Sequence, residues 1–346
     1  MSKKIRVLVV DDSAVIRQLL TDLLTAQPDI EVVGTAFDPF DAREKIKSLS
    51  PDVLTLDVEM PKMDGLSFLE KIMTLRPMPV IMVSTLTGKG TETAIAALQK
   101  GAVDCLAKPN AQTDEELVLF SAELSGKIRV AATARVHAKR ATKTISVRTG
   151  NLSIKSQSPK LIAIGASTGG VEALTEVLSH IPPEIPPIII TQHMPPVFTA
   201  SFAKRLSTFC NIGVQEAADR MPLKPGVALI APGGMQLEVV RAGSGWTCRV
   251  TDKPPVNNHK PSVDVLFDSV ADQAGQEALG VILTGMGKDG ARGLLNMRNC
   301  GAHTIGQDEA SSTVYGMPRT AYEIGAVAEV HTLTDIADAI KERCFI

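Results

Sequence analysis

The sequence predicts two α/β domains, each built around a parallel, doubly wound sheet. At 346 residues, the chain has room for two domains of roughly 150 residues each. Short apolar runs alternate with segments whose apolar residues recur at helical spacing, and only 3% of the residues are aromatic. A basic stretch without Asp or Glu separates two such series, so we expect a linker between the domains.

The first series supplies the strands of the N-terminal domain. Its apolar runs between Ile5 and Pro109 are RVLVVDD, EVVGTAF, DVLTLD, PVIMVS and VDCLAKP. A helical pattern separates each run from the next, as is typical of a five-stranded parallel sheet with helices on both faces. This domain is expected to cover residues 1–125.

Residues 126–158 carry many Lys and Arg and little apolar periodicity, which predicts a flexible linker that is partly helical at its start. A basic strip that docks on an acidic partner is the alternative. The second domain, residues 159–346, resumes the strand and helix alternation with KLIAIGAS, PIIITQH, VALIAP, LGVILTG and HTIGQD. The segment MQLEVVRAGSGWTCRVT alternates about a Gly-Ser-Gly turn and predicts an added antiparallel hairpin.

Composition excludes several classes of protein. The 36 Lys and Arg nearly balance the 38 Asp and Glu, so no strong overall field attracts the chain to nucleic acid. The chain has neither a signal-peptide pattern nor an apolar run of about 18 residues, so we expect a cytoplasmic protein without membrane insertion. The 5 cysteines are widely spaced and are expected to be reduced packing residues.

Polar side chains follow the predicted strands of the first domain. Asp11 and Asp12 end the first strand, Asp57 the third and Ser84 the fourth, and Lys108 follows the fifth. Ligands of parallel sheets bind at the carboxyl ends of strands. Three carboxylates there would repel one another without a hard cation, and Mg²⁺ prefers such ligands. Taken singly, Asp12 could merely cap the next helix, and Lys108 could be solvated.

In this order, VDDS, LDVEMPKMDG, VS and KP resemble a response-regulator receiver domain, which has a flavodoxin-like fold. The resemblance implies that Asp57 accepts a phosphoryl group from a histidine kinase. It implies that Asp11, Asp12 and Asp57 hold Mg²⁺, and that Ser84 and Lys108 sense the phosphoryl group.

The chain departs from many receivers at one position. Three residues before Lys108, where many receivers carry an aromatic residue that moves on activation, this chain has Cys105. The resemblance therefore does not extend to an aromatic relay. The acidic residues and Lys108 are all present.

The stretch LIAIGASTGG poses the main question of the second domain. Such a strand-to-helix turn either cradles a phosphate or presents Ser167 as a nucleophile. A dinucleotide fingerprint would place Gly at Ser167 and an acidic residue at the end of the next strand. That strand instead ends in TQHM and supplies His193. The pattern therefore favours a nucleophilic serine.

A serine nucleophile needs a base, and the base needs a carboxylate that orients it. Ser167 and His193 both follow apolar strands, and the run GVILTG leads into MGKDGARGL, which brings Asp289 to the same rim. The Ser, His, Asp order differs from the Ser, Asp, His order of α/β-hydrolases and argues against that fold. In PPVNNHKPSVD, His259 is an alternative base and Asp264 an alternative acid.

Other residues near these segments have different expected roles. Asp308 is a further alternative acid. His180 is expected at a helix end, and His303 and His331 to be structural or exposed. The glycines in TGMGKDG leave backbone N–H groups free, so the Met286 N–H is the candidate oxyanion donor, while its side chain is expected to pack.

The segments IGASTGG, TQHM, PSVDVLF and LTGMGKDGARGL resemble the catalytic domain of the chemotaxis protein-glutamate methylesterases. The resemblance implies Ser167 as nucleophile, His193 as base and Asp289 as its orienting acid. The substrates would be γ-glutamyl methyl esters of chemoreceptors, with deamidation of receptor glutamines as a second activity. Ester hydrolysis would need no cofactor. Thr168 and His259 are candidates for the substrate site.

The leading hypothesis is a phosphorylation-activated esterase in which the resting receiver shields the catalytic rim. One alternative is a receiver-controlled transcription regulator. The second half is too long for one helix-turn-helix and lacks a basic recognition helix, which argues against it. Another alternative is a non-catalytic adaptor whose GASTGG loop only binds an anion.

Overall fold

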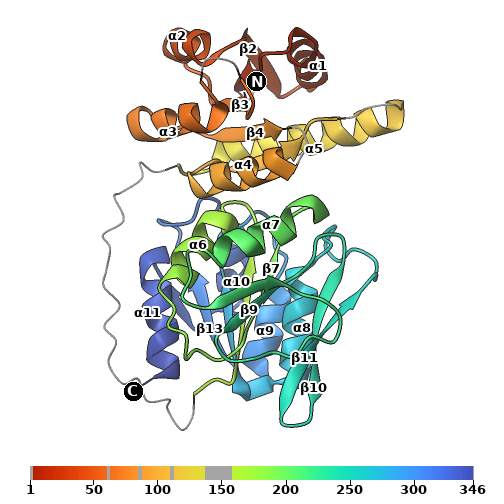
Figure 1. The fold of residues 1–346 in the computed structure, drawn as a ribbon, viewed down its shortest axis with the longest axis vertical. Coiled ribbons are helices and arrows are strands. Elements are labelled where there is room, and N and C mark those ends of the chain that lie inside the picture. Colours follow the sequence, from red (N-terminus) through yellow and green to blue (C-terminus); the bar gives the residue numbers. More distant parts are fainter. Residues whose placement is uncertain (1–2, 61–62, 85–87, 110–112, 137–157, 346) are drawn as a thin grey trace. The chain divides into compact units, whose positions relative to one another are not determined.

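The computed structural model describes residues 3–60, 63–84, 88–109, 113–136 and 158–345. The chain divides into two compact units, Met1–Ala141 and Thr142–Ile346 (Figure 1). Most of the predicted basic linker, residues 137–157, lies outside the described part. Each unit contains its own parallel sheet, as the sequence predicts.

The first unit contains a five-stranded sheet in the order β2-β1-β3-β4-β5, and every neighbouring pair is parallel. Its strands are β1 (Ile5–Val10), β2 (Ile30–Ala36), β3 (Val53–Asp57), β4 (Val80–Ser84) and β5 (Asp104–Ala107). All five match predicted apolar runs. Because β1 and β3 are adjacent, the residues that follow them meet at one edge.

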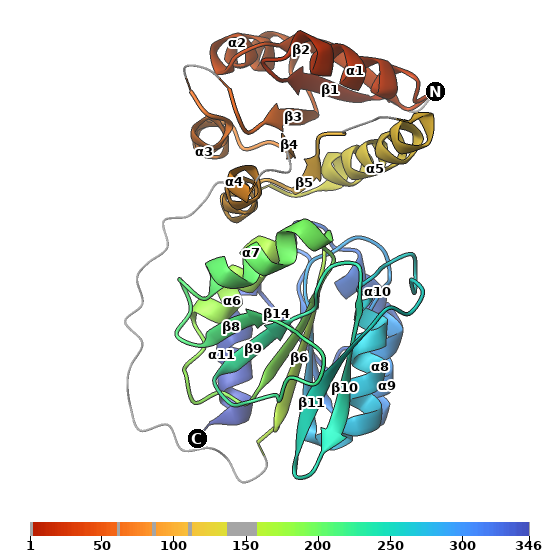
Figure 2. The ribbon, with the colours of Figure 1, turned by 45° about the vertical axis from the view of Figure 1, so that its right-hand side comes forward.

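Helices cover both faces of this sheet: α1 (Ala14–Thr25), α2 (Pro39–Leu49), α3 (Gly65–Leu75), α4 (Gly88–Gln99) and α5 (Asp114–Thr133). Figure 2 shows α1 and α5 on one face and α2, α3 and α4 on the other. Helix α5 continues past the expected linker start at Gly126, because Ile128 and Ala131 are fully buried in the core of this unit.

The second unit contains a seven-stranded parallel sheet in the order β14-β13-β12-β6-β7-β9-β8. Its strands are β6 (Leu161–Ala166), β7 (Ile188–Gln192), β8 (Gly213–Glu216), β9 (Val227–Ile230), β12 (Ala278–Ile282), β13 (His303–Gln307) and β14 (Glu329–His331). The edge strands β8 and β14 were not predicted. Both are short and only partly buried, so neither has a continuous apolar run.

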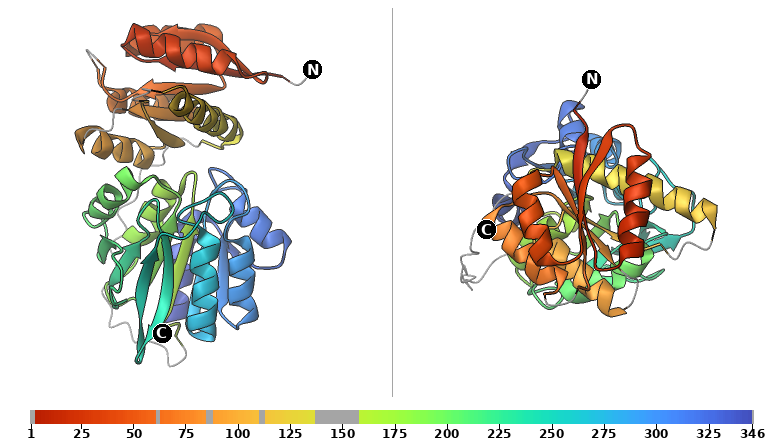
Figure 3. Two further views of the ribbon diagram at one scale, coloured as in Figure 1. Left: turned by 90° about the vertical axis from the view of Figure 1, so that its right-hand side faces the viewer. Right: turned by 90° about the horizontal axis from the view of Figure 1, so that it is seen from above.

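The predicted hairpin is confirmed as β10 (Gln236–Ala242) and β11 (Gly245–Thr251), which pair antiparallel. The helices of this unit are α6 (Gly170–Ser179), α7 (Pro196–Leu206), α8 (Val263–Gln273), α9 (Ala291–Asn299), α10 (Met317–Glu323) and α11 (Leu333–Cys344), with a 3-10 turn η1 (Gly275–Glu277). Figures 2 and 3 show α6, α7 and α11 on one face of the sheet and α8, α9 and α10 on the other, where the hairpin packs against α8.

Helix α8 approaches the backbone of β6 closely. A Cβ added at Gly165 would lie 2.2 Å from Val263 Cγ1 and 3.1 Å from Phe267 Cζ. Glycine is therefore needed at this position for the helix to pack. This packing fixes the N-terminus of α8 near the end of β6, where the candidate site lies. In the described part of the chain, every helix is too short or too polar to cross a bilayer.

Candidate functional site

Ser167 lies on a sharp turn between β6 and α6, as the sequence predicts. Its backbone N–H donates to the Thr284 carbonyl at 3.0 Å, and its carbonyl accepts from Gly170 N–H at 2.7 Å. Gly169 adopts a φ of +78°, and a side chain there would also collide with Thr313. The turn therefore requires glycine at position 169, directly after Ser167 and Thr168.

The structure brings Ser167, His193 and Asp289 into one hydrogen-bonded series. His193 follows β7, and its Nδ1 lies 3.0 Å from Ser167 Oγ. The other ring nitrogen, Nε2, lies 2.8 Å from Asp289 Oδ2. Asp289 lies in the loop between β12 and α9. The carboxyl ends of β6, β7 and β12 thus place the three predicted residues together.

The carboxylate of Asp289 receives donors from the start of α8. Its oxygens accept from Val263 N–H at 2.6 Å, Ser262 Oγ at 2.8 Å and Asn257 Nδ2 at 2.7 Å. Burial alone would raise the pKa of Asp289. Hydrogen bonds from His193, Asn257 and Ser262, with the charge of His193, outweigh burial and hold this pKa below its usual range. Asp289 is therefore ionised and fixed in place.

The alternative acids have other partners. Asp264 accepts from Gly293 N–H at 2.7 Å and from Asn257 Nδ2 at 2.8 Å, and burial raises the pKa of its carboxyl. Asp308 accepts from Ser311 N–H at 3.0 Å. Among the described residues, Asp289 is the carboxylate that contacts the His193 ring. The geometry favours Asp289 as the orienting acid.

The alternative base, His259, lies against His193. Their rings stack with centroids 3.7 Å apart and an interplanar angle of 12°. His180 caps the C-terminus of α6, as expected. His303 and His331 are half-buried, and each lies 3.2 Å from a carboxylate oxygen of Glu329. These two histidines are structural partners of one glutamate.

Met286 directly follows Gly285, where an added Cβ would lie 2.7 Å from Ser167 Cβ, so this part of the loop lies beside the candidate nucleophile. Its backbone N–H donates to no acceptor within the described residues, which leaves it available to a ligand. The expectation that its side chain packs is wrong, because Met286 is 51% exposed. Thr168 is partly buried, and its carbonyl accepts from Thr284 Oγ1 at 2.9 Å.

Three polar residues of the site were not identified from sequence. Gln192 Nε2 donates to the carbonyls of Ser167 and His193 at 2.9 and 3.0 Å, so it ties the two turns together. Asn257 and Ser262 both donate to Asp289. The sequence feature that could have identified them is proximity along the chain, because each lies within a few residues of a predicted site histidine or acid.

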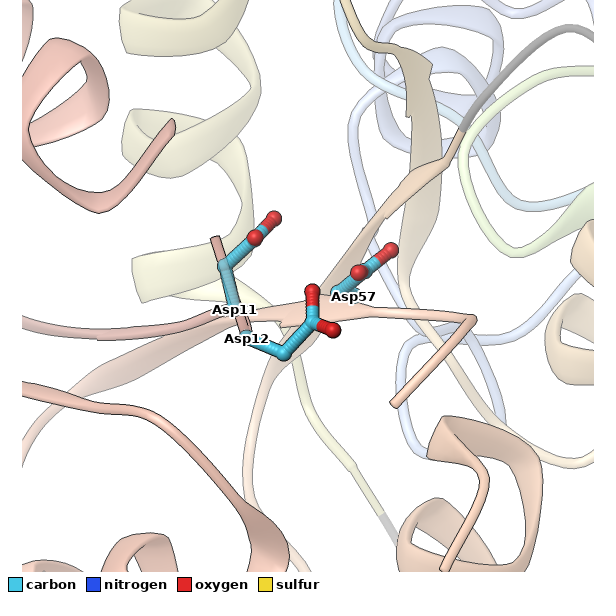
Figure 4. A group of neighbouring side chains, drawn as sticks. All are labelled: Asp11, Asp12 and Asp57. Atoms are coloured by element: carbon cyan, nitrogen blue, oxygen red, sulfur yellow. The ribbon is translucent and has the colours of Figure 1, made fainter. Parts of the chain in front are cut away.

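The first unit has a second candidate site at the ends of β1 and β3. Carboxylate oxygens of Asp11, Asp12 and Asp57 all lie within 4.8 Å of one another (Figure 4). Lys108 Nζ lies 2.7 Å from Asp11 Oδ2 and 2.8 Å from Asp57 Oδ2. Ser84 is buried at the end of β4, and its carbonyl accepts from Lys108 N–H at 2.7 Å. All five predicted residues therefore converge.

Burial raises the pKa of Asp57 to about 6, although Lys108 opposes this increase. Three converging carboxylates are the oxygen donors that a hard divalent cation such as Mg²⁺ prefers, so the residues fit this metal. Cys105 is buried, and burial raises the pKa of its thiol to about 12. Cys105 therefore packs as a neutral residue at the position where many receivers carry an aromatic side chain.

Comparisons with known proteins find relatives of both units. Residues 162–340 match the CheB methylesterase family model, and residues 7–118 match the response regulator receiver domain model. A protein-glutamate methylesterase/protein-glutamine glutaminase of Nitrosomonas europaea is 52% identical, covering 99% of this chain and 97% of that protein. A protein of the same name from Salmonella typhimurium is 53% identical, covering 96% of this chain and 95% of that protein.

Among solved structures, the catalytic domain of the Thermotoga maritima CheB methylesterase matches with a TM-score of 0.52 and 35% identity, covering 54% of this chain and 98% of that chain. The relatives are more than 50% identical over nearly the whole chain, and the receiver and methylesterase models match its first and second parts. These matches assign the chain to one family. The chain belongs to the CheB methylesterase family and carries a response regulator receiver domain ahead of its esterase domain.

Proposed function

We propose that this chain is a phosphorylation-activated serine esterase that hydrolyses glutamate γ-methyl esters on chemoreceptors and also deamidates receptor glutamines. The observation that carries the proposal is the continuous series from Ser167 Oγ through the His193 ring to Asp289. The names of the relatives support the substrate class, since they are protein-glutamate methylesterases and protein-glutamine glutaminases.

The first half-reaction forms an acyl-enzyme. As Ser167 Oγ attacks the ester carbonyl carbon, His193 Nδ1 takes the hydroxyl proton, and negative charge develops on the carbonyl oxygen. The free N–H of Met286 is the proposed donor to this oxyanion. The tetrahedral intermediate then collapses, the bond to the methoxy oxygen breaks, and the imidazolium returns the proton so that methanol leaves.

The second half-reaction restores the enzyme. A water molecule loses a proton to His193 and attacks the acyl carbon, the bond to Ser167 Oγ breaks, and that oxygen regains the proton. The product is a glutamate side chain. With a glutamine substrate the same steps release ammonia. Asp289 stabilises the imidazolium in both halves. The proposed steps require no cofactor, and Thr168, next to Ser167 in the chain, is the proposed substrate contact.

The receiver supplies control in this proposal. Asp57 is the phosphoryl acceptor and a histidine kinase the donor. Asp11, Asp12 and Asp57 would hold Mg²⁺, which neutralises charge on the transferring phosphoryl group when bound. Lys108, now paired with Asp57, would turn to the phosphoryl oxygens, and Ser84 would sense them.

The proposed domain limits remain residues 1–125 for the receiver, 126–158 for the linker and 159–346 for the esterase, with the start of the linker continuing α5. A cytoplasmic location belongs to the same proposal. Chemoreceptors and the kinase are the proposed partners, without nucleic acid binding or membrane insertion.

A serine-directed fluorophosphonate tests the chemistry. We expect it to label wild-type chain at Ser167, located by peptide mass spectrometry, and not to label Ser167→Ala. A folded chain that stays unlabelled at Ser167 would instead support a non-catalytic adaptor.

A further inference from the structure

We propose that Asn257 and His259, both on the turn Val256–His259, are positioning residues that hold the acid and the base of the esterase site. Asn257 holds Asp289, and His259 holds His193. The inference rests on the proposed function, because it assigns a role relative to that chemistry.

The turn itself has a fixed shape. Val256 N–H donates to the His259 carbonyl at 3.0 Å, and His259 N–H donates to the Val256 carbonyl at 2.9 Å. The two residues between them, Asn257 and Asn258, have φ values of 53° and 64°. Asparagine tolerates this left-handed conformation better than most residues. The doubly bonded turn therefore presents Asn257 and His259 in defined directions.

Asn257 joins two buried carboxylates through one nitrogen. Its Nδ2 lies 2.7 Å from Asp289 Oδ1 and 2.8 Å from Asp264 Oδ2. An amide nitrogen carries two protons, so it can donate one to each acid. Asp289 and Asp264 are 1% and 3% exposed, whereas Asn257 itself is exposed. Asn257 therefore acts together with Ser262 to hold Asp289 Oδ1, which leaves Oδ2 directed to His193.

His259 restrains the base from its face. The nearly parallel stack at 3.7 Å covers one side of the His193 ring and opposes rotation about its Cβ–Cγ bond. The hydrogen bonds of His193 to Ser167 and Asp289 lie at the ring edge, so edge and face are constrained by different partners. Loss of the stack would let the ring leave the geometry that proton transfer needs.

The stack is compatible with a base that becomes charged. Burial, and next the charge of His193, lower the pKa of His259 to about 4, while Asp289 acts in the opposite direction. His193 from the end of β7 and Asp289 from the loop before α9 are the ionisable groups that face it. His259 is therefore neutral above about pH 5, and only one of the two stacked rings carries charge during turnover.

Two other roles for His259 make different predictions. As a substrate contact, it would affect KM for receptor but not the reaction of Ser167 with a small phosphonate. As the general base itself, it could not be replaced by phenylalanine. A positioning residue affects the reactivity of Ser167 toward esters and phosphonates alike, and a flat apolar ring can replace it.

The experiment uses the full chain and compares His259→Ala with His259→Phe. Rates of Ser167 phosphonylation and kcat and KM for methanol release from methylated receptor are measured. We expect His259→Ala to lower both the phosphonylation rate and kcat by about tenfold with little change in KM, and His259→Phe to restore most of the loss.

Asn257→Gly tests the acid side with a matched control. Glycine keeps the left-handed turn but removes the amide, whereas Asn258→Gly changes the neighbouring position, whose side chain makes no hydrogen bond within the described residues. We expect a fall of about tenfold in kcat for Asn257→Gly and a rate near wild type for Asn258→Gly. Thermal unfolding midpoints establish that each variant is folded.

The outcomes separate this inference from the proposed function. If wild-type chain is neither phosphonylated at Ser167 nor able to release methanol, the proposed function fails. If wild-type chain reacts and His259→Ala reacts equally fast, the positioning role of His259 is wrong. An increase in KM alone would make His259 a substrate contact. Equal losses of activity in His259→Ala and His259→Phe would also overturn the positioning role of His259. Equal effects of Asn257→Gly and Asn258→Gly on kcat would overturn the positioning role of Asn257.

Discussion

His193 presents Nδ1, at 3.0 Å, to the hydroxyl of Ser167. A ring nitrogen that accepts the serine proton must itself be unprotonated, so the neutral ring carries its proton on Nε2. That N–H points to the Asp289 carboxylate at 2.8 Å. The carboxylate therefore selects the tautomer in which His193 is able to act as a base toward Ser167.

The contact between Ser167 and His193 predicts strongly non-additive losses of activity. Ser167→Ala and His193→Ala should each lower kcat for methanol release by about 10⁶-fold, and the double variant should be only slightly slower. The reason is that Ser167 is a poor nucleophile without a base to take its proton, and His193 has no nucleophile to activate without Ser167. Multiplicative losses in the double variant would mean that the two residues do not act as one unit.

Asp289→Asn should be milder than either change, because Asp289 orients the base and stabilises its charge but does not react. We expect kcat to fall by about 10⁴-fold. Asp308→Asn is the matched control, since its carboxylate accepts from Ser311. Equal losses in the two aspartate variants would contradict the assignment of Asp289.

Gly285→Ala should impair catalysis through a steric effect on the nucleophile. A Cβ at Gly285 would lie 2.7 Å from Ser167 Cβ and 2.3 Å from Met317 Sδ, so Ser167 would have to shift. We expect kcat to fall by about 10²-fold. Gly245→Ala is the control, because nothing lies within 4 Å of its added Cβ. A Gly285→Ala enzyme as fast as Gly245→Ala would show that the turn tolerates displacement.

The lowered pKa of His259 predicts a pH-dependent change in stability. Its ordinary value is 6.5 and its folded value about 4. Between these values the unfolded chain binds a proton that the folded chain does not, so this group makes the free energy of unfolding fall as pH falls. His259→Phe removes the effect.

Urea unfolding of the esterase unit in wild-type and His259→Phe chains tests this at about pH 7.5 and about pH 4.5. The free energy of unfolding of His259→Phe, relative to wild type, should be higher at the lower pH. A difference that is the same at both pH values would mean that His259 is not shifted.

The convergence of Ser167 and His193 could be predicted from the sequence, because their placement depends on strand ends. Ser167 and His193 each follow a continuous apolar run, and a parallel sheet brings the carboxyl ends of such runs to one rim. The acids were harder to separate. Asp289 and Asp264 lie near the same helix start, and only the loop conformation directs Asp289 to the base.

The remaining misses have physical causes. Asn257 reaches Asp289 across 32 residues of sequence through a side chain on a left-handed turn, which no periodicity reveals. The edge strands β8 and β14 are short and half-buried, so they lack an apolar run. The Met286 side chain was expected to pack because it is apolar, but it is exposed. An apolar residue in a loop beside a site need not be buried.

Control by the receiver predicts a difference between a fragment and the full chain. If the unphosphorylated receiver inhibits the esterase, a fragment that begins near Ser158 should release methanol faster than the resting full chain. The fragment contains the hydrophobic core cluster that runs from Leu161 to Val327, which supports independent folding. A fragment no faster than the resting chain would mean that the receiver activates by contact or by delivery to the receptor.

The most direct test of phosphorylation-controlled ester hydrolysis is methanol release from methylated receptor by the full chain, with and without a small-molecule phosphodonor and Mg²⁺. We expect the phosphodonor to increase the rate for wild-type chain, to have no effect on Asp57→Asn, and to produce no methanol with Ser167→Ala. Stimulation that persists in Asp57→Asn, or methanol release by Ser167→Ala at the wild-type rate, would contradict the proposed function.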